Sequence, residues 1–148
     1  MKYNNENLVE IIYVEFIRKN IKYKKDIYLI LNNEMKHNLK NPHIEQYFID
    51  CTYYAIPQNN HNYRLLIILG YDKNLSKSVL VLLALIKNEN IETFSIILNY
   101  IKNKYKFKPK FLTSDMCKSQ IIEIKRELPD TNIVYCFFLF NKSNSITF

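Results

Sequence analysis

The chain has 148 residues with a formal net charge of +7, and 48% of its residues are hydrophobic. This length and composition suit a single folded domain and exclude a wholly disordered chain. The single glycine excludes the glycine-rich loops that hold phosphates or dinucleotides, because both need several glycines close together. The cysteines are too scattered for a disulfide framework or a zinc knuckle, and we expect reduced thiols at Cys51, Cys117 and Cys136.

No part of the sequence predicts a targeting or membrane-spanning segment. The N-terminal stretch MKYNNENLVE is polar and has no apolar signal-peptide region. The longest apolar run, from Val79 to Ile86, has eight residues, whereas a membrane-spanning helix needs roughly 20. We therefore expect a soluble intracellular protein, nuclear or cytoplasmic, with no membrane partner.

Residues 1–45 have the spacing of an N-terminal helical segment. Apolar side chains recur at helical intervals between Leu8 and Phe16, and Asn5 or Asn7 could cap that helix. A second helix is predicted from about Asp26 to Met35. The dipeptide Asn41-Pro42 then marks a break in the chain.

Residues 46–140 predict an α/β core, followed by a short tail at residues 141–148. Short runs of β-branched and aromatic residues between turn residues predict strands, and amphipathic runs predict helices. The strands are expected at Tyr47–Tyr54, Tyr63–Tyr71, Ser78–Ile86, Phe111–Ser114 and Ile133–Phe140, and the helices at about 90–104 and 116–127. This β-β-β-α-β-α-β order is expected of a ribonuclease H-like mixed sheet, in which antiparallel pairing gives way to parallel pairing.

Two aspartates carry the most specific chemistry. Asp50 interrupts an apolar strand, and Asp115 directly follows another strand. A carboxylate inside an apolar element is costly without a partner, and two carboxylates on adjacent strands could share Mg²⁺ or Mn²⁺. The alternative is that Asp50 faces solvent on an edge strand and that Asp115 only caps the next helix.

The order of the short motifs resembles the catalytic domain of Mutator-like element (MULE) transposases. The resemblance runs from about Tyr47 to Phe140. It rests on Asp50-Cys51-Thr52-Tyr53, Leu83 to Phe94, Leu112-Thr113-Ser114-Asp115, Glu127-Leu128-Pro129 and Cys136 to Leu139. It implies a ribonuclease H-like DDE transposase that cuts and transfers DNA strands. It also implies that the catalytic metal ligands, for Mg²⁺ or Mn²⁺, are Asp50 and Asp115.

The sequence departs from the family pattern at three places. Cys51 stands where the family has glycine, and Leu139 stands where it has histidine. The family's third acid lies downstream of the last strand, and residues 141–148 contain no acid. We therefore expect a truncated or inactive copy, since a two-metal site built from two carboxylates lacks a ligand. No other acid of the core matches the third position; these acids are Glu89, Glu92 and Glu123.

A lysine-rich segment after the helix at 90–104 is the candidate nucleic-acid contact. Its basic residues alternate with Tyr105 and Phe107, and this pattern suits phosphate contact and base stacking. The lysines are Lys102, Lys104, Lys106, Lys108 and Lys110. The alternative is a plain lysine-rich loop, in a chain whose many Asn, Lys, Ile and Tyr residues reflect an AT-rich coding sequence.

Three functional hypotheses remain open. The leading one is a MULE-type DDE transposase domain that acts on DNA with Mg²⁺ or Mn²⁺ and needs no small-molecule cofactor. The second is a non-catalytic remnant that binds DNA or another protein. The third is a ribonuclease H-like nuclease with a rearranged third acid. An uncovered sheet edge would also favour self-association.

Overall fold

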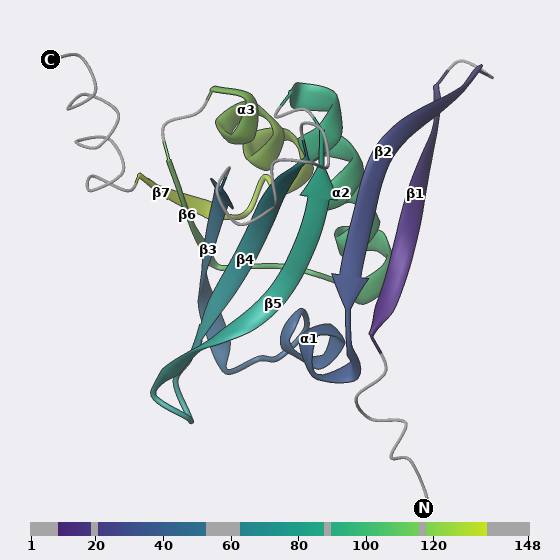
Figure 1. The fold of residues 1–148 in the computed structure, drawn as a ribbon. Helices are drawn as coiled ribbons and strands as arrows, with labels where there is room; N and C mark the ends of the chain where they lie inside the picture. Colours follow the sequence, from purple (N-terminus) through teal and green to yellow (C-terminus); the bar gives the residue numbers. More distant parts are fainter. Residues whose placement is uncertain (1–8, 19–20, 53–62, 88–89, 116–117, 136–148) are drawn as a thin grey trace, which may run out of the picture.

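The chain folds around one mixed sheet (Figure 1). The computed structural model describes residues 9–18, 21–52, 63–87, 90–115 and 118–135. In these ranges seven strands follow the spatial order β1-β2-β5-β4-β3-β6-β7. The strands are β1 Glu10–Arg18, β2 Ile21–Leu31, β3 Ile44–Thr52, β4 Arg64–Asp72, β5 Lys77–Ile86, β6 Phe111–Ser114 and β7 Asn132–Tyr135. The helices are α1 Asn33–Asn38, α2 Ile91–Tyr105 and α3 Lys118–Glu127. The predicted α/β class is thus confirmed.

Strands β3 to β7 correspond to the α/β core that the sequence predicted at residues 46–140. Antiparallel pairing joins β3 to β4 and β4 to β5, whereas β6 and β7 add in parallel on the other side of β3. The described elements lie within a few residues of their predicted positions. Part of the last predicted strand, residues 136–140, lies outside the described residues. Because β3 lies between β4 and β6, Asp50 is not on an edge strand, although its side chain is exposed to solvent as that alternative expected.

The two helices predicted in the N-terminal segment are wrong. Strands β1 and β2 form an antiparallel hairpin, and β2 pairs with β5 from Ile27 to Ile30. The residues between Leu8 and Phe16 are mostly β-branched or aromatic, which favours extended backbone. Apolar residues recur in this stretch at both alternating and helical spacing, so periodicity alone could not distinguish a strand from a helix. The open edge of β5 decided the outcome, and among the described residues before β3 only the six-residue α1 is helical.

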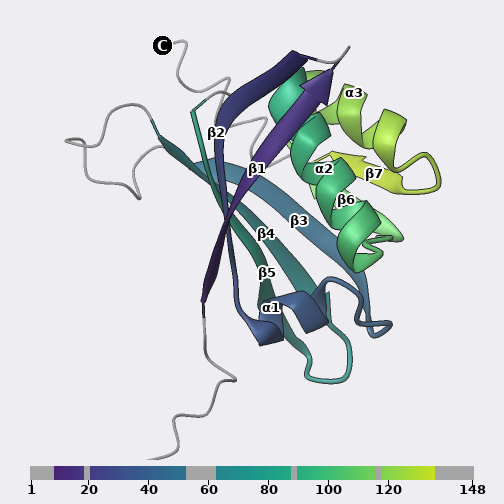
Figure 2. The same ribbon diagram turned by 90° about the vertical axis from the view of Figure 1, so that its right-hand side faces the viewer.

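The helices α2 and α3 cover one face of the sheet, and α1 lies at the end where β3 begins (Figure 2). The apolar face of α2 is buried against the strands through Phe94, Ile97 and Ile101, and α3 adds Ile124. Alternate residues of the strands meet these helices and are fully buried; they include Ile27, Leu29, Leu66, Ile68, Ala84 and Leu112. Burying each such Leu, Ile or Phe side chain contributes about 1.5–3 kcal/mol.

The opposite face of the sheet has no helix over it among the described residues (Figures 1 and 2). Its side chains alternate with the buried ones along the same strands. The apolar residues there that are more than a third exposed include Leu69, Tyr71 and Leu80. No helix in the described part of the chain is long and apolar enough to cross a membrane.

Candidate functional site

The two predicted metal ligands belong to neighbouring parallel strands, Asp50 within β3 and Asp115 directly after β6. Phe48 of β3 pairs with Thr113 of β6, and the two preceding pairs keep the same offset of 65 positions. Continued by two residues, this offset sets Asp50 level with Asp115. Neighbouring strands lie about 4.8 Å apart, and level positions on parallel strands present their side chains to the same face. The register therefore aligns the two carboxylates across adjacent strands.

Both aspartates are accessible from the face of the sheet that the described helices leave uncovered. Asp50 is exposed and follows the buried Ile49, whereas Asp115 is half-buried. Ser114 points the other way, because its hydroxyl donates a hydrogen bond to Oε1 of Gln120 on α3. This buried bond anchors the end of β6 just before Asp115. Two carboxylates open to solvent suit a hard divalent cation that keeps several water ligands.

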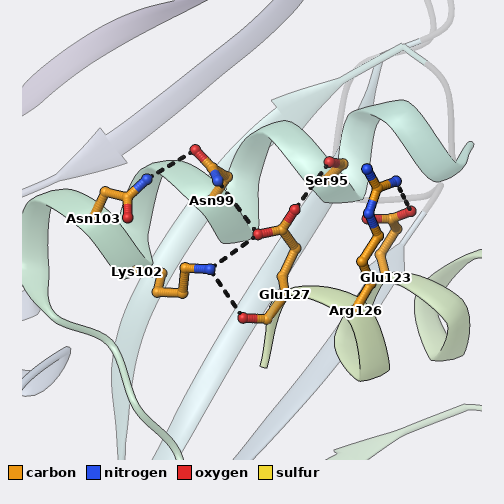
Figure 3. Close-up of polar contacts among 7 residues, drawn as sticks. All are labelled: Ser95, Asn99, Lys102, Asn103, Glu123, Arg126 and Glu127. Atoms are coloured by element: carbon orange, nitrogen blue, oxygen red, sulfur yellow. Dashed lines mark hydrogen bonds and ion pairs between the residues drawn. The ribbon is translucent and has the colours of Figure 1, made fainter. Parts of the chain in front are cut away.

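No third acid joins the pair within the described residues. Those residues contain no group of three His, Cys, Asp or Glu side chains placed to hold a metal ion. Glu123 of α3 is fully buried on the helix-covered face, and its carboxylate lies 3.7 Å from Nη1 of Arg126 (Figure 3). Glu92 is exposed in the first turn of α2. Glu89 lies outside the described residues, so the hypothesis of a rearranged third acid gains no support here.

Comparison with known families identifies the domain that contains these residues. A family model described as the MULE transposase domain matches residues 47–143. The chain belongs to this family. The match begins in β3, includes Asp50 and Asp115, and leaves out the β1–β2 hairpin. No curated protein matches the chain.

The lysine segment of this MULE domain is divided into two parts by the fold. The ammonium of Lys102 donates to the carboxylate and the backbone carbonyl of Glu127, each at 3.2 Å (Figure 3). Lys104 donates to the hydroxyl of Tyr100 at 2.9 Å and lies over the Tyr105 ring. These two lysines therefore serve the packing of α2 and are occupied by intramolecular contacts.

The aromatic residues of the segment belong to the core. Tyr105 and Phe107 are 6% and 1% exposed, and the Phe107 ring packs edge-on against Tyr47 with centroids 4.9 Å apart. The prediction that they interleave with lysines to stack on bases is therefore wrong. Basic and aromatic residues alternate here because every second residue from Tyr105, the last residue of α2, onwards faces the core.

The remaining lysines lie far from the aspartates. Lys110 directly precedes β6 and Asp115 directly follows it. Five residues of extended chain span about 16 Å, so the structure does not bring the lysine segment and the aspartates together. It does place the exposed Lys40, which the sequence did not single out, around one hollow with Lys106, Lys108 and Lys110. Only tertiary contact between α1 and the α2–β6 connection could reveal this grouping.

Proposed function

We propose that this MULE domain is the DNA-cleaving and strand-transferring core of a DDE-type transposase. Asp50 and Asp115 are its metal ligands in this proposal, and Mg²⁺ or Mn²⁺ is the cofactor. The observation that carries it is the parallel register of β3 and β6, whose continuation by two residues sets Asp50 level with Asp115. The sheet order supports a ribonuclease H-like fold, because the first strand of the meander, β3, also receives β6 and then β7 in parallel.

The chemistry follows from what the two side chains offer. A divalent cation held there would polarise a phosphate oxygen and lower the pKa of a bound water. Asp50 and Asp115 supply charged oxygen ligands on two rigid strands, and the Ser114–Gln120 bond anchors the second of these strands against α3. The backbone spacing of neighbouring strands, about 4.8 Å, is short enough for two carboxylates to share one ion.

A complete two-metal site needs more ligands than these two. In the family the third acid follows the last strand of the core, and the described residues offer no group of three metal-binding side chains. From the described residues we therefore propose that Asp50 and Asp115 hold one divalent cation. The second candidate function, a non-catalytic DNA-binding domain, is favoured by the exposed lysines around one hollow.

Calorimetric titration with Mn²⁺ tests the proposed metal site. The wild-type chain is compared with Asp50→Asn and Asp115→Asn, which keep the side-chain shape and remove the charge. Asp130→Asn is the matched control, because Asp130 is exposed and lies in the turn before β7, at the other end of the sheet. We expect one site in the wild type and the control and none in either test variant.

Two results would overturn the metal site. One is the absence of binding by a wild-type sample whose circular dichroism shows that it is folded. The other is binding that survives both test substitutions, since the ion would then be held elsewhere. In the first case the non-catalytic DNA-binding function becomes the better account of the domain.

A further inference from the structure

A basic hollow lies at the end of the sheet opposite the two aspartates. It has a volume of about 330 Å³ and lies between the turn that joins α1 to β3 and the connection that joins α2 to β6. The apolar part of its lining comes from Leu39, Pro42, Ile44 and Tyr47, and the charged part from Lys40, Lys106, Lys108, Lys110 and Glu45.

The alternation of the α2–β6 connection orients its lysines outward. From residue 105 to residue 110 every second side chain is buried, including Phe107 and Pro109, and every other one is an exposed lysine. The backbone turns at Lys106, the C-cap of α2, with φ 59° and ψ 34°. This left-handed conformation favours glycine, so a lysine there is held at some cost to the fold.

The hollow has a net positive charge even after its one acid, Glu45, is paired with lysines. The carboxylate of Glu45 lies 2.8 Å from Nζ of Lys73 and 3.9 Å from Nζ of Lys110. The hydrogen bond from Lys73 holds the pKa of Glu45 below its usual value, so this acid is ionised and already neutralised. Among the described residues, the other lysines of the hollow form no ion pair; they are Lys40, Lys106 and Lys108.

The spacing of these lysines selects the class of ligand. In extended chain Lys106 and Lys110 are separated by about 13 Å, and alternate residues by about 6.6 Å. Attachment points spread over this length suit a ligand whose negative charges are also spread along a chain. A nucleic-acid strand presents a phosphate about every 3.4 Å along its axis. Lysines spaced at about 6.6 Å can therefore each reach a separate phosphate.

We propose that this hollow binds the phosphate backbone of duplex DNA without reading its sequence. The inference rests on DNA as the substrate of the proposed function, and it adds a second contact away from the aspartates. The separation of about 16 Å between Lys110 and Asp115 equals about five base-pair steps of 3.4 Å. The contact therefore holds DNA that flanks the cleaved position and contributes affinity rather than chemistry.

Fluorescence anisotropy with a labelled 20-base-pair duplex tests this contact. The variants are Lys106→Gly, Lys108→Met and the triple variant that adds Lys40→Met to both. Lys106→Gly removes a charge and also relieves the left-handed backbone, so its fold should be at least as stable as the wild type. The matched control is Lys125→Met, which removes an exposed lysine from α3.

We expect each single test variant to weaken binding roughly 3- to 10-fold near 0.1 M salt. The slope of log K against log salt should fall by about 0.9 for each lysine removed, and by almost 3 in the triple variant. Lys125→Met should bind as the wild type does. Wild-type affinity in the triple variant, or an equal loss in Lys125→Met, would overturn the proposal.

Further arms separate this proposal from its alternatives and from the metal site. The triple lysine variant should still bind Mn²⁺ as the wild type does. If pyrophosphate binding depends on the lysines and duplex binding does not, the hollow is a small-anion site and the DNA contact is wrong. A failed Mn²⁺ titration leaves this measurement intact, so the two proposals fail independently.

Discussion

Lys102 and Glu127 join the ends of α2 and α3. The lysine ammonium lies 3.2 Å from Oε2 of Glu127 and 3.2 Å from its backbone carbonyl oxygen (Figure 3). The same carboxylate accepts hydrogen bonds from Ser95 and Asn99, so three side chains of α2 contact one residue of α3. A lysine that the sequence placed in a nucleic-acid contact thus holds two helices together.

We expect Lys102→Met to lower the free energy of unfolding by about 1 kcal/mol. The Lys102–Glu127 pair is partly exposed. Its contribution to the free energy of unfolding should therefore be larger than that of an exposed surface ion pair and smaller than that of a buried one. Urea unfolding at pH 7 measures the change. DNA affinity should fall less than in Lys108→Met, because Lys102 is already paired; an equal or larger fall would contradict this assignment.

Glu123 should be a source of instability in this fold. Its side chain is fully buried, and both carboxylate oxygens lack a hydrogen-bond partner among the described residues. The nearest charge, Nη1 of Arg126, is 3.7 Å away on a side chain that is 69% exposed. Replacing a poorly paired buried charge by an apolar side chain of similar volume often stabilises a protein.

Glu123→Leu is therefore expected to raise the free energy of unfolding by about 1–2 kcal/mol in urea titrations. Arg126→Met serves as the control and should change stability by less than about 1 kcal/mol, since its side chain is largely solvated. A loss of stability in Glu123→Leu would show that the carboxylate has a stabilising partner.

Gly70, the one glycine of the chain, has no room for a side chain. A Cβ atom there would lie 2.7 Å from Cγ2 of Ile44 and 3.2 Å from both Tyr47 and Val81. We expect Gly70→Ala to cost about 1–3 kcal/mol through overpacking of the core between β3, β4 and β5. Thermal and urea unfolding measure this cost.

The reason for that cost can be checked with a second substitution. In an Ile44→Ala background the closest contact is gone, so Gly70→Ala should cost less than it does in the wild type. Equal costs in the two backgrounds would show that the Ile44 contact is not the cause.

The hydroxyl of Tyr47 ties β3 to α1. It donates a buried hydrogen bond to the carbonyl oxygen of Asn38 at 3.0 Å. Tyr47→Phe should cost about 1 kcal/mol at pH 7, because the carbonyl loses its partner. Burial raises the pKa of the Tyr47 phenol well above its ordinary value of 10.

This pKa shift gives the Tyr47 contribution a defined pH dependence. Above pH 10 the unfolded chain loses the phenol proton while the folded protein keeps it, so stability falls as pH rises. The stability advantage of the wild type over Tyr47→Phe should therefore be constant from pH 7 to 9 and shrink above pH 10. Urea unfolding across this range measures it, and a constant advantage up to pH 11 would contradict the buried neutral phenol.

Much of the core could be predicted from local pattern. Turn residues separate the β-branched runs of β4 and β5, and the residue order of α2 alone indicates both its apolar face and its charge distribution. The motif order around Asp50 and Asp115 was sufficient to indicate the family that the match to residues 47–143 shows. These features depend on residues close together in the chain, where propensity and spacing act directly.

Other features depended on distant residues. The β1–β2 hairpin formed because β5 offered an open edge, although the same apolar run also fits a helix. Lys40 joined the hollow only because α1 packs beside the start of β3, 60 or more residues before its other lysines. Tyr105 and Phe107 are buried because their rings remove apolar area from water in the core. The neighbouring lysines had suggested exposed rings that stack on bases.

The sequence by itself thus determined the composition of each core element, the two aspartates and the family. The tertiary structure decided which strand each element paired with, which lysines were left free of internal pairing, and the parallel register of β3 and β6 that leads to Asp50 and Asp115. The physical reason is that propensity and periodicity act within a few residues, whereas strand register and burial depend on partners far apart in the chain.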